Sequence, residues 1–281
     1  MNNWQDGFVN ANGIKVHYYR TGGDKPQVVL NHGAMDDGLC WTRVTKELEQ
    51  DYDVIMMDTR GHGLSDNGEG DYQSETRAKD LAEAIMALGL EKPVVGGHSL
   101  GAEVSLHLAA LYPDISRAIF FEDPPIAMSG EPMFGGKIGE QGVDALKMMT
   151  RVMNLIKILP IFLGKIIAKK MMPVSPDDEI IPWVNSKKRV DKDFFDSLTN
   201  PNNPEPTSPF EVAKKIKVPA LLFMGDRELG SIVSKEVAQE LAKSIPGLQI
   251  AHLRGANHDI RRAKFEEYIT VLKNFLDEAY S

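Results

Sequence analysis

The sequence predicts an α/β fold built on a mostly parallel sheet, and three observations support this fold class. Short apolar segments rich in β-branched and aromatic residues alternate with segments of helical periodicity, as in strands joined by helices. The 281 residues suffice for one large domain or two modest ones. The alternation stops at residue 126 and resumes at residue 210. We therefore expect one α/β core, residues 1–125 and 210–281, with a helical insertion, residues 126–209.

Eight strands are expected in the core. The first two, within residues 8–19, surround Asn12-Gly13, a dipeptide that favours the tight turn of a hairpin. The other six are short apolar segments at residues 27–31, 52–57, 93–96, 117–121, 219–224 and 249–253. Apolar residues at helical spacing, as in Leu81 and Ile85, predict helices at residues 41–48, 74–88, 102–111, 233–243 and 262–279.

The insertion is predicted to be mainly helical, because unstructured loops of such length are uncommon. Its first helix, within residues 143–159, should have an apolar face and a basic polar face: Leu146, Met149, Met153 and Ile156 against Lys147, Arg151 and Asn154. Pro160 separates this helix from a second one at residues 161–172. A proline-rich stretch, residues 199–209, is expected to return the chain to the core.

Composition argues against several classes of protein. A net charge of −8, from 32 Lys and Arg against 40 Asp and Glu, argues against a nucleic-acid partner. The single cysteine, Cys40, excludes an intramolecular disulfide and a cysteine-based zinc site, and we expect no metal or cofactor. No apolar stretch reaches the ~18 residues of a membrane span, and the first residues lack a signal-peptide pattern. We therefore expect a cytoplasmic protein.

The stretch Gly97-His98-Ser99-Leu100-Gly101 predicts a nucleophile. It lies directly between a predicted strand and a predicted helix, where a serine on a sharp, strained turn needs small neighbours. The following helix would point its first N–H groups at any negative charge that develops there. A serine hydroxyl is a weak nucleophile that needs a base, so Ser99 predicts a histidine partner.

His258 is the candidate base, because it lies between the last predicted strand and the last predicted helix. Loops at the carboxyl ends of strands are where the sites of open α/β sheets collect. The other histidines fall in predicted strands, in a helix or in turn motifs: His17, His32, His62, His98, His107 and His252.

Together these motifs resemble those of the α/β-hydrolase superfamily, in its lid-bearing branch. The matching stretches are His32-Gly33 with Trp41, residues 58–65 (D-T-R-G-H-G-L-S), residues 97–101 and residues 255–258. The resemblance implies an eight-stranded, mostly parallel sheet with the insertion as a lid after the sixth strand. It also implies an oxyanion hole formed by the backbone N–H groups of Leu100 and Ala34, whereas His32 and Arg60 would tie loops together.

The carboxylate that orients the histidine has more than one candidate. In most of the superfamily it follows the strand before the histidine strand, where Glu228 fits one count of the expected position and Asp226 lies nearby. Asp123, which precedes two prolines after the sixth strand, resembles the acid of zearalenone-type lactone hydrolases and haloalkane dehalogenases. We favour Asp123, then Glu228, then Asp226; a capping role for Asp123 in the turn is the alternative.

The resemblance implies a serine hydrolase that cleaves carboxylic esters or lactones through an acyl-enzyme intermediate. Its expected partner is a small hydrophobic ester or lactone under a methionine-rich lid. Serine at position 99 disfavours epoxide hydrolases and dehalogenases, whose nucleophile is aspartate. Cofactor-free haloperoxidases, carbon–carbon bond hydrolases and small-molecule receptors of the strigolactone or karrikin type remain alternatives. The basic polar face of the first lid helix is also compatible with contact with an anionic membrane surface. We favour the lid interpretation over this membrane contact. The oligomeric state is not predicted.

Overall fold

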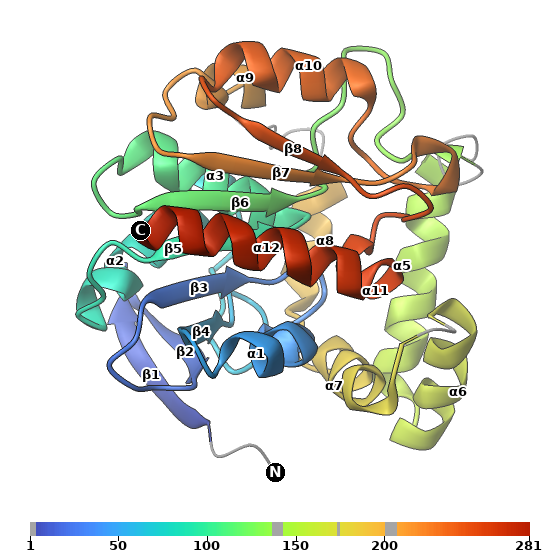
Figure 1. Cartoon of the computed structure of the whole chain (residues 1–281). Helices are drawn as coiled ribbons and strands as arrows, with labels where there is room; N and C mark the ends of the chain where they lie inside the picture. The colour runs from blue at the N-terminus through green and yellow to red at the C-terminus, as the bar shows by residue number, and fades with distance from the viewer. Residues whose placement is uncertain (1–3, 137–142, 173–174, 200–206) are drawn as a thin grey trace.

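The chain folds around one eight-stranded sheet (Figure 1), in a computed structural model that describes residues 4–136, 143–172, 175–199 and 207–281. The strand order is β1-β2-β4-β3-β5-β6-β7-β8. β1 and β2 form an antiparallel hairpin, β2 pairs antiparallel with β4, and the remaining pairs are parallel. The predicted fold class is thus confirmed. The strands are β1 Gln5–Ala11, β2 Ile14–Arg20, β3 Gln27–Asn31, β4 Asp53–Met57, β5 Val94–His98, β6 Ala118–Glu122, β7 Ala220–Met224 and β8 Gln249–His252.

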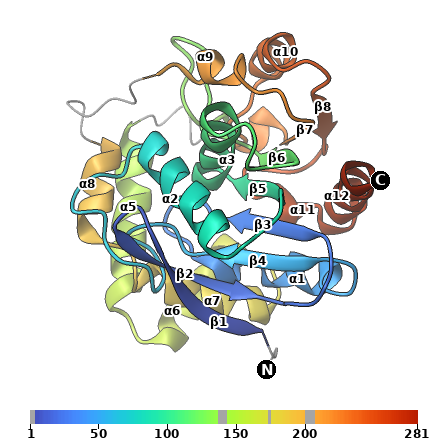
Figure 2. The ribbon, with the colours of Figure 1, turned by 90° about the vertical axis from the view of Figure 1, so that its left-hand side faces the viewer.

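Helices cover both faces of the sheet (Figures 1 and 2). Successive strand residues point to opposite faces, so Val29 and Ile55 pack into one hydrophobic cluster while Val28 and Val54 pack into another. The first face is covered by α2 Ser74–Ala87, α3 Leu100–Leu111, α9 Pro209–Ala213 and α10 Lys235–Ser244. The second face is covered by α1 Thr42–Leu48, α11 Ile260–Ala263 and α12 Phe265–Tyr280.

Local sequence explains the hairpin and one departure from prediction. Asn12 and Gly13 both adopt positive φ, 47° and 81°, as the predicted tight turn requires. The single helix predicted over residues 262–279 is instead two helices, α11 and α12, which meet at Lys264 with φ −134° and ψ 54°. These angles lie outside the α-helical region, so Lys264 cannot continue the helix and the chain turns there.

Among the described residues, four helices lie between β6 and α9: α5 Val143–Ile158, α6 Ile161–Met171, α7 Asp177–Lys187 and α8 Lys192–Thr199. The predicted break at Pro160 separates α5 from α6. Met153 and Ile156 are buried and Arg151 and Asn154 are exposed, as the two-faced pattern predicts. The side chains of residues 146, 147 and 149, and most of the proline-rich stretch 199–209, lie outside the described residues.

A third hydrophobic cluster joins these helices to the core. Met35, Tyr72 and Leu100 of the core pack in it with Trp183 and Phe194 of the insertion. The insertion therefore packs on the segments that follow β3, β4 and β5. None of the helices that the structure describes is both long and apolar enough to cross a membrane.

Candidate active site

The sheet brings the predicted site residues to one edge. Ser99 follows β5 directly, Asp123 follows β6 directly, and His258 lies between β8 and α11. β3, β5 and β6 are parallel neighbours, so their carboxyl ends lie together. This is the edge at which open α/β sheets carry their sites.

Ser99 occupies a strained turn between β5 and α3. Its φ of 52° and ψ of −116° lie in a region that non-glycine residues rarely adopt. Small neighbours permit the turn: a Cβ at Gly97 would lie 2.3 Å from the Gly101 backbone, and one at Gly101 would lie 2.3 Å from the Asn31 carbonyl oxygen. The turn places Ser99 at the N-terminus of α3, where the residue is half-buried. Its hydroxyl makes no hydrogen bond to another described residue.

Asp123 holds the His258 imidazole. His258 Nδ1 donates a hydrogen bond of 2.7 Å to Asp123 Oδ2, which leaves Nε2 as the nitrogen available to another group. The Asp123 side chain is fully buried, whereas 22% of the His258 side chain is exposed. Burial lowers the pKa of His258, but the hydrogen bond and negative charge of Asp123 outweigh that effect and raise the pKa above its usual value.

Asp123 is itself fixed by the turn that follows β7. Its carboxylate accepts hydrogen bonds from Ser231 Oγ at 2.7 Å, from the Ile232 N–H at 2.8 Å and from the Val233 N–H at 2.9 Å. The backbone of Asp123 has a φ of 44°, a conformation that costs energy for a non-glycine residue. These contacts hold the strained residue in place and leave Oδ2 directed at His258.

The two other acid candidates both lie in the loop that follows β7. Glu228 lies in a short 3₁₀ helix, Arg227–Leu229, with an exposed side chain. Asp226 accepts hydrogen bonds from His252 Nε2 and from the Gly255 N–H, both at 2.7 Å. Of the three predicted candidates, the structure therefore brings Asp123 to His258, and Asp226 braces the loop that leads to it.

Aromatic rings surround His258. The ring of His98, the residue before Ser99, lies 4.6 Å from it, centroid to centroid, and His98 Nε2 donates to the His258 carbonyl at 3.1 Å. Phe134 meets the imidazole edge to face at 5.4 Å. These contacts tie the histidine loop to the turn that carries Ser99.

Neutral histidines shape the loop predicted to supply an oxyanion donor. His62 Nε2 accepts a hydrogen bond from the Met35 N–H at 3.3 Å, and His32 Nε2 accepts from the Thr59 N–H at 3.0 Å. Each ring must be neutral to accept, and burial lowers the pKa of both. Ala34 lies in this loop and packs against the third hydrophobic cluster, to which Leu100 belongs. The two predicted oxyanion residues therefore contact the same cluster.

Buried cations fasten the same loop to the insertion. Lys187 Nζ, at the end of α7, donates to the Met35 carbonyl at 2.7 Å, and Ser186 Oγ donates to it at 3.2 Å. Arg262 in α11 pairs with Asp36 at 3.1 Å and with Glu179 of α7 at 3.4 Å. The insertion, the loop after β3 and the helix after His258 thus meet in one buried polar network.

Arg227 ties a further segment to the site. Its guanidinium donates to four backbone carbonyls, those of Pro132, Met133, Ser231 and Ile232. Through these bonds one side chain connects the segment that places Phe134 on His258 with the turn that holds Asp123.

Sequence reasoning missed Ser231, Arg227, Ser186, Lys187 and Arg262. The adjacent Arg261 and Arg262, three and four residues after His258, were one visible signal, since buried arginines need partners. In the described part of the chain, no group of three or more His, Cys, Asp or Glu residues is arranged to hold a metal ion.

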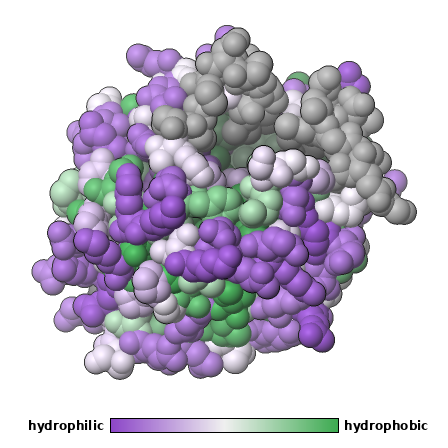
Figure 3. All heavy atoms as spheres, turned by 90° about the horizontal axis from the view of Figure 1, so that it is seen from above, coloured by the Kyte–Doolittle hydropathy of each residue, from purple (hydrophilic) through white to green (hydrophobic). Residues whose placement is uncertain are grey.

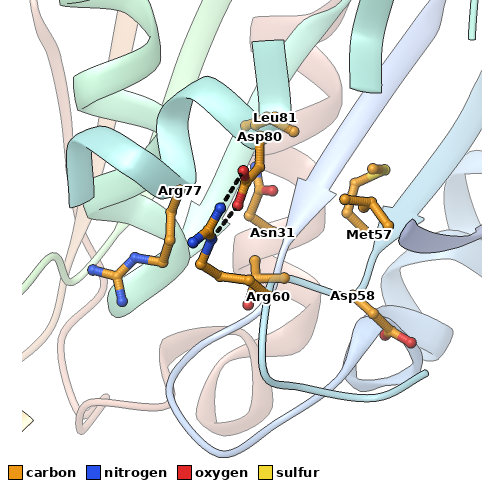
Figure 4. Close-up of a pocket in the computed structure, with 9 residues that line it drawn as sticks. Asn31, Met57, Asp58, Arg60, Arg77, Asp80 and Leu81 are labelled. Atoms are coloured by element: carbon orange, nitrogen blue, oxygen red, sulfur yellow. Dashed lines mark hydrogen bonds and ion pairs between the residues drawn. The ribbon is translucent and has the colours of Figure 1, made fainter. Parts of the chain in front are cut away.

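A small cavity lies apart from Ser99, Asp123 and His258 (Figure 4). Arg60 crosses it and pairs with Asp80 of α2 through hydrogen bonds of 2.5 and 2.7 Å. Arg60 also donates to the Asp71 carbonyl at 2.9 Å. It therefore joins the turn after β4 to α2, the tying role predicted for it.

The architecture of the chain is that of an α/β-hydrolase fold. Residues 26–141 match a family model described as the alpha/beta hydrolase fold. This match, the sheet order and the structural relatives below all show the α/β-hydrolase fold in this chain.

Similar proteins of known activity are hydrolases. The chain is 25% identical to an N-formylmaleamate deformylase from Pseudomonas putida, over 96% of each chain. It is 25% identical to a 2-(acetamidomethylene)succinate hydrolase from Mesorhizobium japonicum, over 92% of this chain and 90% of that one. A crystal structure of an N-formylmaleamic acid deformylase from Pseudomonas putida superposes with a TM-score of 0.78 at 20% identity, covering 95% of this chain and all of that chain. These relatives support hydrolase activity in this chain.

Proposed function

We propose that the protein is a serine hydrolase in which Ser99, His258 and Asp123 form the catalytic triad. The observation that carries the proposal is the hydrogen bond from His258 to the buried Asp123 carboxylate, together with a serine held at positive φ at the end of the neighbouring strand. His258 Nε2 would take the proton of the Ser99 hydroxyl as its oxygen attacks the substrate carbonyl carbon. The proton would then pass to the leaving group, and an acyl ester on Ser99 would be hydrolysed by water.

The proposed oxyanion hole consists of the Leu100 and Ala34 N–H groups. Leu100 is the first residue of α3, where backbone N–H groups are free of intrahelical partners and carry partial positive charge. Each such donor typically contributes about 3 kcal/mol to transition-state stabilisation. In this proposal the helical insertion encloses the substrate, since its side chains pack beside Ala34 and Leu100.

Carboxylic esters or lactones are the proposed substrates. N-acyl amides are the second candidate, because the two relatives at 25% identity are named for hydrolysis of an N-formyl compound and an acetamido compound. The same triad serves both classes, which differ in the leaving group that His258 must protonate: an alcohol or an amine.

A substrate panel tests the proposal. Wild type, Ser99→Ala and Ser105→Ala would be assayed with p-nitrophenyl acetate and butyrate, a set of lactones, and N-formyl and N-acetyl amides. Ser105 lies on the same helix with its hydroxyl bonded to the Gly101 carbonyl, so it controls for the loss of a hydroxyl. We expect turnover of at least one class, a loss on the order of 10⁴-fold or more in Ser99→Ala, and near wild-type turnover in Ser105→Ala.

Two outcomes would count against the proposal. Turnover that persists in Ser99→Ala would place the chemistry elsewhere. Background turnover of the whole panel by wild type, together with ligand-dependent shifts in melting temperature, would favour a receptor on this scaffold.

A further inference from the structure

Helix α6 presents its small residues to the protein and most of its large apolar residues to solvent, with Ile167 packed against the third hydrophobic cluster. Its buried residues are Gly164 and Ala168, and a Cβ on Gly164 would lie 2.7 Å from Cγ1 of Val184 in α7. The exposed fractions are 46% for Ile161, 65% for Phe162 and 54% for Ile166. A surface helix normally buries its large apolar side chains and exposes its polar ones, so α6 has the reverse arrangement.

The last turn of α5 extends this surface. Leu155 is 46% exposed and Ile158 is 77% exposed, the largest exposed fraction among the large apolar residues that the structure describes. Within one helix, residues three or four positions apart are neighbours, so Leu155 lies beside Ile158 on α5 and Phe162 lies beside Ile166 on α6. Together with Ile161 and Leu163 they make up the exposed apolar surface of these two helix segments. We call it the apolar patch: Leu155, Ile158, Ile161, Phe162, Leu163 and Ile166.

The patch lies where a large flat partner can reach it. In both ribbon views α6 is at the periphery, with α7 on its inner side (Figures 1 and 2). By contrast, hydrophilic residues cover most of the face that carries α9 and α10 (Figure 3). Apolar surface gathered on one projecting element is a common mark of an interaction site.

The segment that carries the patch is rich in basic residues. Residues 145–176 contain no Asp or Glu and six basic residues: Lys147, Arg151, Lys157, Lys165, Lys169 and Lys170. Asp177 pairs with Lys165 at 2.5 Å and with Lys169 at 2.8 Å, which offsets part of this charge. Large apolar side chains beside basic ones on an exposed helix are the chemistry that binds an anionic lipid surface.

A second copy of the chain fits this surface less well. In a two-fold dimer through the patch, each subunit would present the same basic residues to its partner. Like charges brought together at an interface oppose association. Anionic lipid headgroups have the opposite charge, and acyl chains would cover the apolar side chains.

We propose that α6 and the last turn of α5 dock on an anionic membrane surface, with Ile158, Phe162 and Ile166 among the acyl chains and the lysines of α6 at the headgroups. This binding does not depend on the hydrolase chemistry, since it uses none of the proposed catalytic residues.

Vesicle co-sedimentation tests the proposal with the full chain. One set of vesicles contains phosphatidylcholine and phosphatidylglycerol in equal amounts, and the other contains phosphatidylcholine alone. The apolar variants are Phe162→Ser and Ile158→Ser, with Met86→Ser on α2 as the matched control because Met86 is 57% exposed. The charge variant is Lys170→Gln, with Lys243→Gln on α10 as its control. Thermal melts would show that each variant is folded.

We expect wild type to bind the mixed vesicles and to bind pure phosphatidylcholine far more weakly. Each apolar variant should lose about tenfold or more in binding. Lys170→Gln should lose about fivefold in vesicle binding. Added salt should release wild type from the vesicles. Both controls and Ser99→Ala should bind the vesicles as wild type does. Binding that is absent, equal on both vesicle types, or unchanged in folded Phe162→Ser and Ile158→Ser overturns the proposal. A wild-type dimer that Phe162→Ser converts to a monomer also overturns it, in favour of a second copy.

Discussion

Asp123 shows how single residues are committed to the proposed site. Its side chain is fully buried and accepts hydrogen bonds from Ser231, Ile232, Val233 and His258. Its positive φ costs on the order of 1–3 kcal/mol and persists because these bonds determine its position. Glu228, the competing candidate, lies exposed on the surface. Backbone strain at both Ser99 and Asp123 marks the two strand ends where the chemistry is proposed.

Asp123→Asn should lower kcat by about 10⁴-fold, as expected when the residue that orients the histidine loses its charge. Neutral His258 is the active base, so the rate should rise with pH through a pKa that lies above 6.5. Removal of the Asp123 charge lowers that pKa, so the acid limb of the kcat profile should move to lower pH. The measurement is the pH dependence of ester turnover.

Glu228→Gln is the matched control, since it makes the same chemical change at an exposed site. It should leave kcat within about threefold of wild type, as is usual for surface substitutions. A loss in Glu228→Gln that equals the loss in Asp123→Asn would remove Asp123 from its proposed role.

At the scale of elements, the end of α7 acts on a loop of the core. Lys187 and Ser186 both donate to the Met35 carbonyl, next to the proposed oxyanion donor Ala34. Arg262 joins α11 to the same loop through Asp36. The insertion therefore supports the proposed site in addition to lying beside it.

Lys187→Met should lower kcat by about tenfold to a hundredfold with a smaller change in KM, because a shifted loop misplaces a donor that acts mainly in the transition state. Lys192→Met, whose side chain is 86% exposed on α8, serves as the control and should match wild type. Steady-state kinetics on an ester substrate measures the split. An unchanged kcat in a folded Lys187→Met protein would show that the contact has no part in positioning.

Contacts that cross between core and insertion should make the whole molecule unfold as one unit. Glu179 pairs with buried Arg262, and Lys46 pairs with Asp178 at 2.7 Å. The third hydrophobic cluster also contains residues of both the core and the insertion. We expect coincident thermal transitions by far-ultraviolet circular dichroism and tryptophan fluorescence, which reports on Trp4 and Trp41 in the core and on Trp183 in the insertion. A separate earlier transition in one signal would show that the insertion unfolds on its own.

Much of this architecture follows from local sequence. The hairpin at Asn12-Gly13, the alternating strands and helices, and the break at Pro160 each depend on residues close together in the chain. The positions of Ser99 and His258 at strand ends follow from the same alternation. Their proximity then follows from the parallel sheet, which the sequence pattern also predicts.

The acid and its supports could not be predicted in the same way. Asp123 and Glu228 both follow strands that end at the same edge, so the choice depends on how the loop after β7 folds. That loop turns its Ser231 hydroxyl and two N–H groups onto Asp123, a contact across 108 residues. Lys187 and Met35 are 152 residues apart. Such contacts arise from tertiary packing and leave no periodic signal.

Covalent labelling tests the central claim most directly. The protein would be treated with a serine-directed fluorophosphonate, and the adduct would be located by intact-mass and peptide mass spectrometry, with Ser99→Ala and His258→Ala beside wild type. We predict one adduct per chain, on the peptide that contains Ser99, none on that peptide in Ser99→Ala, and much slower labelling in His258→Ala. Absence of an adduct in wild type, or an adduct on a different serine, would contradict it.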